Sequence, residues 1–113
     1  MKLKFIILIA ALLLLGCSTV NYDSFATCLG EKGVTFYGAF WCPHCQNQKK
    51  LFGSSVDKLP YVECSAPDGK AQLQECTDKK IISYPTWEFA DGSRLKGEQS
   101  LKILSEKTGC AIE

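Results

Sequence analysis

Two cysteines separated by two residues form the most chemically specific feature of the chain, Cys42-Pro43-His44-Cys45. At this spacing, where an apolar segment leads into a helix, they can close a small disulfide that stays accessible. At the helix N-terminus, unpaired backbone amides and the helix dipole stabilise the thiolate of Cys42. Pro43 suits the first turn of a helix. A protonated or hydrogen-bond-donating His44 would stabilise the same anion, so the motif predicts a redox-active pair.

The stabilised thiolate also sets the expected direction of the chemistry. Stabilising Cys42 as a thiolate favours the reduced form of the pair, which makes its disulfide form a stronger oxidant. We therefore expect the disulfide to accept electrons from substrate thiols, with Cys42 as the sulfur that is attacked. Cys45, one turn further along the helix, is expected to be more buried and to act as the resolving thiol.

Other uses of the motif fit the sequence less well. A zinc site would need two further ligands, whereas the chain has no second Cys-x-x-Cys and only one histidine. Haem attachment requires a histidine directly after the second cysteine, where this chain has Gln46. A purely structural disulfide in so short a loop would add little stability. We therefore expect no metal and no cofactor.

The segments around the motif indicate the elements that hold it in place. Residues 34–40 are β-branched and aromatic with little polar alternation, which is typical of a strand buried on both faces. The expected elements are a helix begun by Asp23 or Ser24 and ended by Gly30 and Gly33, a strand over 34–40, a helix over 46–52, a strand over 61–64, a helix over 70–77, strands over 86–90 and 94–96 joined by Asp91-Gly92, and a helix capped by Ser100 and stopped by Gly109. This order predicts an α/β fold with a mixed four-stranded sheet flanked by helices on both faces.

The large apolar side chains divide into core and surface candidates. Trp41 and Tyr84 are expected to flank the disulfide as an apolar landing surface for unfolded substrates. Trp87 fits that surface or the core equally well, because it lies one step into a strand. The core candidates are Phe36, Tyr37, Phe40, Val62, Phe89 and Leu104.

Residues 1–16 have the pattern of an export signal. Lys2 and Lys4 precede the apolar run 5–15. These eleven apolar residues fall short of the roughly 20 that a membrane-spanning helix needs. The pattern therefore predicts a secretory signal peptide.

The end of that signal carries a second feature, Gly16-Cys17. The stretch resembles the lipobox of bacterial lipoproteins, which implies that Cys17 is lipidated as the first mature residue. We then expect a lipidated tether over 17–22 and a folded domain over 23–113, anchored to a membrane by the lipid. The alternative is an ordinary signal peptide whose Cys17 pairs with another thiol.

Composition narrows the class of partner and the compartment. The 113 residues carry a net charge of +1, and the chain after the signal has 11 basic and 12 acidic side chains. This near-neutral balance gives no electrostatic reason to expect a nucleic acid as partner. Beyond Cys17 there are six further cysteines, which indicates an oxidising compartment for so small a chain.

Two landmarks together resemble the thioredoxin superfamily. Phe40-Trp41 followed by the Cys-x-x-Cys motif is the first, and Ser83-Tyr84-Pro85-Thr86 before a strand is the second. The resemblance implies a thioredoxin-like fold in which Pro85 is cis and exposes backbone groups that pair with the substrate, with Tyr84 beside it. The alternative for Tyr84-Pro85 is an ordinary trans turn. The Pro-His dipeptide is the one DsbA uses, although the chain has no room for the helical insertion of that branch.

A longer match extends over nearly all of residues 22–110. Segments 37–45, 61–64 and 84–87 resemble the thioredoxin-like domain fused to bacterial vitamin K epoxide reductase homologues. That resemblance implies an oxidase of exported proteins, reoxidised by a membrane partner that passes electrons to a quinone. We expect this chain to be a stand-alone lipoprotein on the extracytoplasmic, periplasmic side of a bacterial membrane, beside a vitamin K epoxide reductase-like or other redox partner.

One position departs from the superfamily pattern. Many members carry a buried acidic residue six positions before the first active-site cysteine, where it helps to move protons. This chain has Phe36 there. Proton transfer from Cys45 therefore needs water or another group.

The remaining four cysteines are expected to form two structural bridges. A bridge between Cys64 and Cys76 closes a 13-residue loop, a size for which chain entropy suggests roughly 3 kcal/mol of stabilisation, and the resemblance points to the same pair. The pairing of Cys28 with Cys110 rests mainly on elimination. The alternative is that one of the pairs is a second redox relay.

Two other functions remain open at this stage. The first is a reductase or isomerase of the same fold, kept reduced by a membrane electron donor. The second is a non-catalytic lipoprotein that binds a partner through the aromatic surface around Tyr84 and Trp87.

Overall fold

The computed structural model describes residues 21–113. The expected signal peptide over 1–16, the lipidation site Cys17 and all but the last two residues of the expected tether lie outside the described residues. Four short strands form one sheet in the order β2-β1-β3-β4. Their bounds are β1 Thr35–Gly38, β2 Tyr61–Glu63, β3 Thr86–Glu88 and β4 Arg94–Lys96.

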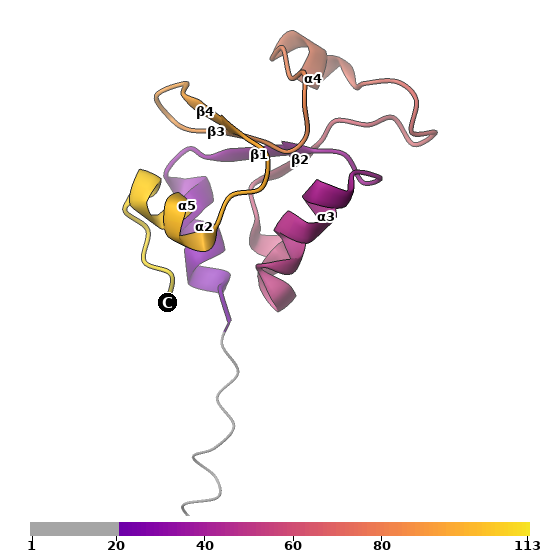
Figure 1. The fold of residues 1–113 in the computed structure, drawn as a ribbon. Helices are drawn as coiled ribbons and strands as arrows, with labels where there is room; N and C mark the ends of the chain where they lie inside the picture. The colour runs from indigo at the N-terminus through magenta and orange to yellow at the C-terminus, as the bar shows by residue number, and fades with distance from the viewer. Residues whose placement is uncertain (1–20) are drawn as a thin grey trace, which may run out of the picture.

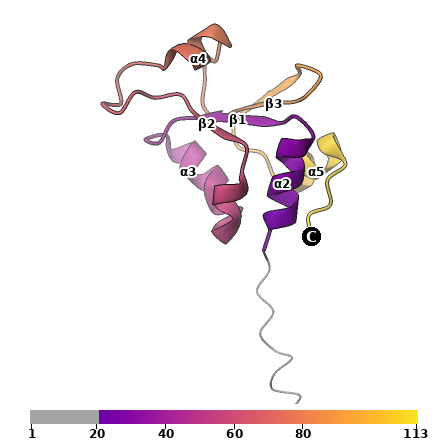
Figure 2. The ribbon, with the colours of Figure 1, turned by 180° about the vertical axis from the view of Figure 1, so that it is seen from behind.

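The sheet is mixed, as predicted. Strand β1 pairs in parallel with β2 and antiparallel with β3, and β3 pairs antiparallel with β4. Helices α2 (Asp23–Glu31), α3 (Pro43–Lys50) and α5 (Leu101–Thr108) lie on one face, and α4 (Gln74–Asp78) lies on the other (Figures 1 and 2). The predicted α/β class is therefore confirmed, and the arrangement is that of the thioredoxin-like fold.

The central strand separates two apolar clusters. Phe36 points into the larger cluster, where its ring stacks on Trp87 with centroids 4.6 Å apart. Its neighbour Tyr37 points into the smaller cluster beneath α4, because successive strand residues face opposite ways. Trp87 is fully buried, so of its two expected places it occupies the core.

Phe40 is not a core residue, contrary to the prediction. Its side chain is 47% exposed, because β1 ends at Gly38 and Phe40 lies in the turn that leads to α3. The other predicted core residues in and next to the strands are less exposed than Phe40: Phe36, Tyr37 and Phe89 are buried. Val62 is half-buried against the smaller cluster.

The helix boundaries show where local patterns succeed and fail. Helix α5 begins and ends as predicted, since the Ser100 hydroxyl accepts a hydrogen bond from the Ile103 amide at 3.1 Å and Gly109 has φ = +79°. Helix α2 has Tyr22 at its N-cap with no side-chain cap, so the prediction that Asp23 or Ser24 caps it is wrong. A short 3₁₀ helix, η1 (Gly53–Lys58), was not predicted.

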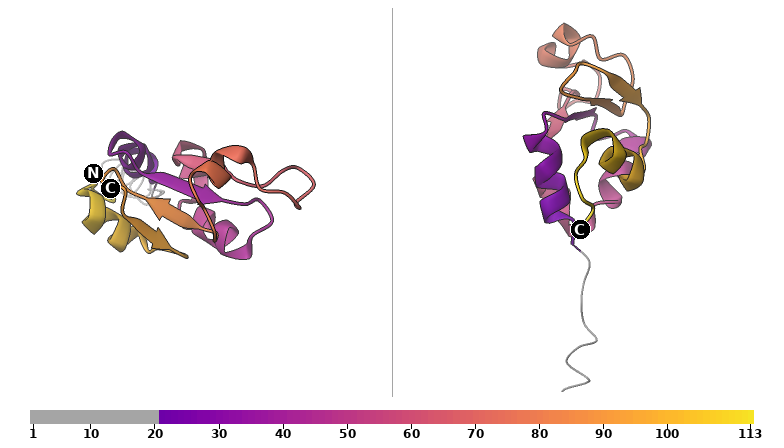
Figure 3. Two further views of the ribbon diagram at one scale, coloured as in Figure 1. Left: turned by 90° about the horizontal axis from the view of Figure 1, so that it is seen from above. Right: turned by 90° about the vertical axis from the view of Figure 1, so that its left-hand side faces the viewer.

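Helix α4 is shorter than the predicted helix over 70–77. The residues before it form an irregular loop in which Ser65 pairs with Gln72 as an isolated bridge and the Ala66 amide donates to the Ala71 carbonyl. This loop extends away from the sheet at the end opposite the C-terminus (Figures 1 and 3).

Two disulfides fasten this fold, and they are the pairings expected from the sequence. Cys28 of α2 is bonded to Cys110, just beyond α5, and Cys64 at the end of β2 is bonded to Cys76 of α4. The first bridge ties the N-terminal helix to the C-terminal segment. The second joins the residue after β2 to α4, so it holds together the two elements between which the loop of residues 65–73 runs.

Candidate active site

Cys42 occupies the N-cap of α3. The chain turns sharply after β1, with the Cys42 amide donating to the Ala39 carbonyl at 3.0 Å, and Pro43 is the first residue of the helix. The backbone of Cys42 is extended (φ −79°, ψ 119°), and its carbonyl accepts the first helical hydrogen bond, from Gln46 at 3.0 Å. Its sulfur therefore lies where the free amides of the first helical turn and the helix dipole favour a negative charge.

Cys45 lies one turn further into α3 and is completely buried. Burial, with a smaller effect of the neighbouring Cys42, raises the pKa of the Cys45 thiol from 9.0 to about 12. Cys45 therefore carries its proton at neutral pH. Among residues 21–113, Cys42 and Cys45 are the two free cysteines.

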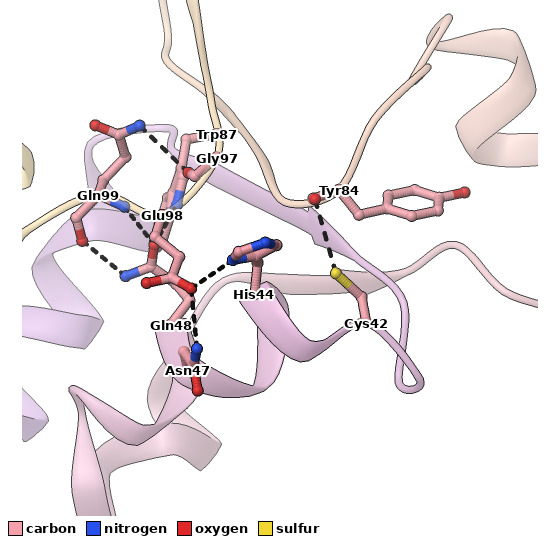
Figure 4. A network of polar contacts seen from close by, with 9 residues as sticks. All are labelled: Cys42, His44, Asn47, Gln48, Tyr84, Trp87, Gly97, Glu98 and Gln99. Atoms are coloured by element: carbon pink, nitrogen blue, oxygen red, sulfur yellow. Dashed lines mark hydrogen bonds and ion pairs between the residues drawn. The ribbon is translucent and has the colours of Figure 1, made fainter.

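The proline landmark lies against this pair. The Tyr84-Pro85 peptide bond is cis, so the alternative of a trans turn is wrong. The Cys42 thiol faces the Tyr84 carbonyl oxygen at 3.7 Å (Figure 4). The fold thus brings together the two landmarks that are 40 residues apart in the sequence. The roles expected for Pro85 and Tyr84 in binding substrate stay predictions.

Two aromatic rings, those of Trp41 and Tyr84, lie next to Cys42. Trp41 is 48% exposed and meets the ring of Tyr84 edge-on, with centroids 5.9 Å apart. Each ring is anchored at its polar end, since Trp41 Nε1 donates to Ser65 Oγ at 2.8 Å and the Tyr84 hydroxyl accepts from Gln72 Nε2 at 2.7 Å. The rings therefore form a rigid rim next to Cys42. Both anchors come from the loop before α4.

His44 turns away from Cys42. Its Nδ1 lies 2.8 Å from Glu98 Oε1, and its side chain is 72% exposed. Asn47 Nδ2 donates to the same carboxylate oxygen at 3.1 Å (Figure 4). The hydrogen bonds from His44 and then Asn47 hold the pKa of the Glu98 carboxyl below its ordinary value. Within the described residues His44 makes no hydrogen bond to Cys42, so its expected effect on the thiolate would act through space and stays a prediction.

A shallow hollow opens beside Cys42, lined by His44, Tyr84, Gly97 and Glu98. It runs between the first turn of α3 and the loop that follows β4. Its walls offer an aromatic ring, a backbone segment and a charged pair. A substrate segment that reaches Cys42 from this side would meet all three.

Gln48 is a positioning residue that the sequence analysis did not single out. It is fully buried on α3, and its Oε1 accepts from Trp87 Nε1 at 3.1 Å and from the Gln99 amide at 2.7 Å. Its Nε2 donates to the Gln99 carbonyl at 2.9 Å (Figure 4). These bonds tie the active-site helix to β3 and to the segment before α5. Its sequence signal is weak, because the expected helix over 46–52 has only a thin apolar face.

The described part of the chain shows neither a metal-binding cluster nor a membrane-spanning helix. Residues 21–113 contain no group of three His, Cys, Asp or Glu side chains arranged to hold a metal ion. No helix of that part is both long enough and apolar enough to cross a membrane.

Comparison with known proteins relates the chain to a thiol-disulfide oxidoreductase. No protein-family model matches the chain. The chain is 43% identical over 90 residues to the thiol-disulfide oxidoreductase LTO1 of Arabidopsis thaliana, and the match covers 75% of this chain. The matched region is only 23% of the length of that relative, so the likeness concerns one part of a longer protein.

Proposed function

Since the chain is homologous to a thiol-disulfide oxidoreductase, we propose that it is itself an extracytoplasmic enzyme that oxidises dithiols of exported proteins. The observation that carries this proposal is the state of its cysteines. Cys42 and Cys45 are free at the N-terminus of α3, while the other four in residues 21–113 are bonded in two bridges. Among the cysteines of residues 21–113, only the first pair is therefore available for exchange with a substrate.

The reaction proceeds by two thiol–disulfide exchanges. A substrate thiolate attacks Cys42 Sγ in the Cys42–Cys45 disulfide, and the bond between the two enzyme sulfurs breaks. Cys45 leaves as a thiolate and takes up a proton. A second substrate thiolate then attacks the substrate sulfur of the mixed disulfide, and Cys42 leaves as a thiolate that the helix N-terminus stabilises. The substrate gains a disulfide, and the enzyme retains the two electrons.

The surface around Cys42 supports a protein substrate. Tyr84 presents its backbone carbonyl next to Cys42 Sγ, just before the cis bond to Pro85, and the exposed ring of Trp41 offers apolar contact to an unfolded chain. We place the substrate backbone along Tyr84–Pro85 and its apolar side chains against Trp41. This assigns to the three residues the roles expected from the sequence.

The reduced enzyme must pass the two electrons on to an oxidant before it can react again. The resemblance of segments 37–45, 61–64 and 84–87 to the domain that accompanies vitamin K epoxide reductase homologues supports a membrane partner of that type, linked to a quinone. A lipid on Cys17 would hold the enzyme at the same membrane, on the extracytoplasmic side. The apolar run 5–15 and Gly16-Cys17 support this location.

The redox state of the active site in cells tests the direction of the reaction. In acid-quenched cells treated with an alkylating mass tag, we expect no tag on most of the protein, because Cys42 and Cys45 are then joined as a disulfide. A protein that carries two tags in most molecules would instead be a reductase or isomerase. The double variant Cys42→Ser, Cys45→Ser is the matched control, since it shows how many tags the other cysteines accept.

The membrane anchor has a separate test. Metabolic labelling with a palmitate analogue is expected to mark the wild-type protein. The labelled protein is expected in the membrane fraction of lysed cells. Cys17→Ser is expected to lose both the label and the membrane association. A Cys17→Ser variant that still takes up the label would contradict the assignment, and Cys42→Ser, which keeps Cys17, is the control.

A further inference from the structure

Cys45 must lose a proton before it can attack, and it must regain one when it leaves. Its burial makes both steps difficult, because the pKa of this thiol is raised to about 12. Phe36 offers no help, since it is fully buried and stacked on Trp87. The proton must therefore pass through water or through another residue. The ionisable groups that act on Cys45 are Cys42, at the N-cap of α3, and Lys49 of α3. Cys45 in turn acts on Tyr61 of β2, which is hydrogen-bonded to Glu63 of the same strand.

The packing around Gly38 places the Tyr61 hydroxyl near the Cys45 sulfur. A Cβ atom added to Gly38 would lie 3.0 Å from Cys45 Sγ and 3.3 Å from the Tyr61 hydroxyl oxygen. The sulfur and the hydroxyl therefore both border the space that a side chain at Gly38 would fill. Gly38 does not have a positive φ, so the requirement for glycine there is one of space. Glycine at this position keeps the route from Cys45 to Tyr61 open.

Glu63 continues the route away from the sulfur. The Tyr61 hydroxyl donates to Glu63 Oε1 at 3.0 Å, between residues that lie two apart on one face of β2. The other carboxylate oxygen accepts the backbone amides of Ser65 at 3.0 Å and Phe40 at 3.2 Å. Phe40 follows β1 and Ser65 follows β2, so the carboxylate is held in place from both strands.

The surroundings of Tyr61 favour a neutral phenol that passes protons on over a phenolate that holds a negative charge. Burial, and then the hydrogen bond to Glu63, raise the pKa of the Tyr61 phenol far above its ordinary value. Tyr61 therefore does not rest as a phenolate, and it can pass a proton only by gaining one as it gives one. The ammonium group of Lys49 lies 3.7 Å from the centre of the Tyr61 ring, where its positive charge favours a thiolate on Cys45.

We propose that Tyr61 and Glu63 form the proton relay of Cys45, taking the place of the acidic residue that Phe36 replaces. The proposal rests on the proposed function and adds its proton-transfer groups. When Cys45 resolves a mixed disulfide, its S–H proton passes to the Tyr61 oxygen while the Tyr61 proton passes to Glu63 Oε1. The Cys45 thiolate then attacks Cys42 Sγ, and the bound thiol leaves with the electron pair of its S–S bond. In the opposite direction the same route returns the proton to Cys45.

The test follows the reduced full-length protein as it reacts with oxidised glutathione, with acid quenching and mass analysis. The first step, attack of Cys42 on glutathione disulfide, depends on the glutathione concentration. The second step, release of glutathione by Cys45, does not. Tyr61→Phe is expected to slow the second step roughly 100-fold at pH 7, the lower end of what positioned proton transfer supplies, and to leave the first step unchanged. The difference is expected to shrink toward pH 9, because hydroxide then removes the proton directly.

Two further variants separate a relay from a structural effect. Glu63→Gln keeps an oxygen for the Ser65 and Phe40 amides but removes the base, so it should slow the same step, and the double variant should be no slower than the slower single one. Tyr37→Phe removes the hydroxyl of a buried tyrosine whose side chain packs on the other face of the sheet and should change neither step.

The outcomes distinguish this proposal from the proposed function. A Tyr61→Phe protein that releases glutathione at the wild-type rate at pH 7, or is slowed equally at pH 7 and pH 9, overturns the relay. A wild-type protein that never forms the mixed disulfide on Cys42 overturns the proposed function itself. A mixed disulfide that forms normally and is then released slowly only in the Tyr61 and Glu63 variants supports both.

Discussion

Cys45→Ser is expected to accumulate proteins bound to Cys42 through mixed disulfides, whereas Cys42→Ser accumulates almost none. The reason is the different environment of the two sulfurs. Cys42 lies at the N-cap of α3 beside the Tyr84 carbonyl and keeps 6% of its surface exposed, while Cys45 is fully buried with a thiol pKa of about 12. At neutral pH only roughly one Cys45 thiol in 10⁵ is a thiolate. Without Cys45, a substrate that reacts with Cys42 has no internal thiol to release it.

Turnover is expected to fall in both variants. Either substitution removes the redox pair, so the rate at which a reduced protein substrate is oxidised should drop by roughly 1,000-fold or more, the scale on which loss of a covalent nucleophile acts. The measurement is non-reducing electrophoresis for the mixed disulfides and a free-thiol assay for the rate. Cys42→Ser, Cys45→Ser is the control for chance pairing through the remaining cysteines. If Cys42→Ser retained more mixed disulfides than Cys45→Ser, the assigned roles would be reversed.

The order of the elements could be predicted because each has a local signal. The apolar run over 34–40 marked β1, and Ser100 with Gly109 bounded α5 correctly. The prediction extended β1 two residues too far, since Ala39 and Phe40 are apolar. In the structure the Ala39 carbonyl accepts the Cys42 amide instead of a strand partner. Residue type alone does not show whether a carbonyl accepts a hydrogen bond within a turn or from a neighbouring strand.

The site was predictable where its residues are close in sequence and not where the fold joins distant ones. The motif at 42–45 identified both cysteines, but His44 pairs with Glu98, 54 residues away, and nothing near Glu98 in the sequence marks it. Tyr61 and Glu63 are two apart on a strand, yet their nearness to Cys45 depends on the register in which Gly38 pairs with Glu63. Register between separate strands is a tertiary property.

The two structural bridges are expected to differ in what their loss does. Replacing both cysteines of the Cys28–Cys110 bridge with alanine should lower the free energy of unfolding by roughly 4.5 kcal/mol, because that bridge joins residues 82 positions apart. Loss of Cys64–Cys76, with a separation of 12, should cost roughly 3 kcal/mol. For so small a domain, whose total stability is on the order of 5–15 kcal/mol, the first loss is expected to bring the protein close to unfolding. Guanidinium titrations of the two double-alanine variants measure both values.

The smaller stability loss is expected to have the larger effect on the active site. Cys64–Cys76 fastens both ends of the loop whose Gln72 donates to the Tyr84 hydroxyl, and Tyr84 in turn faces Cys42. Cys28–Cys110 joins α2 to the segment after α5, and within the described residues it takes no part in the hydrogen bonds that hold Tyr84. In a folded sample, we therefore expect the Cys64→Ala, Cys76→Ala variant to react more slowly with a protein substrate at Cys42. The Cys28→Ala, Cys110→Ala variant should react at the wild-type rate. The opposite ranking of the two variants in rate would show that the loop does not position Tyr84.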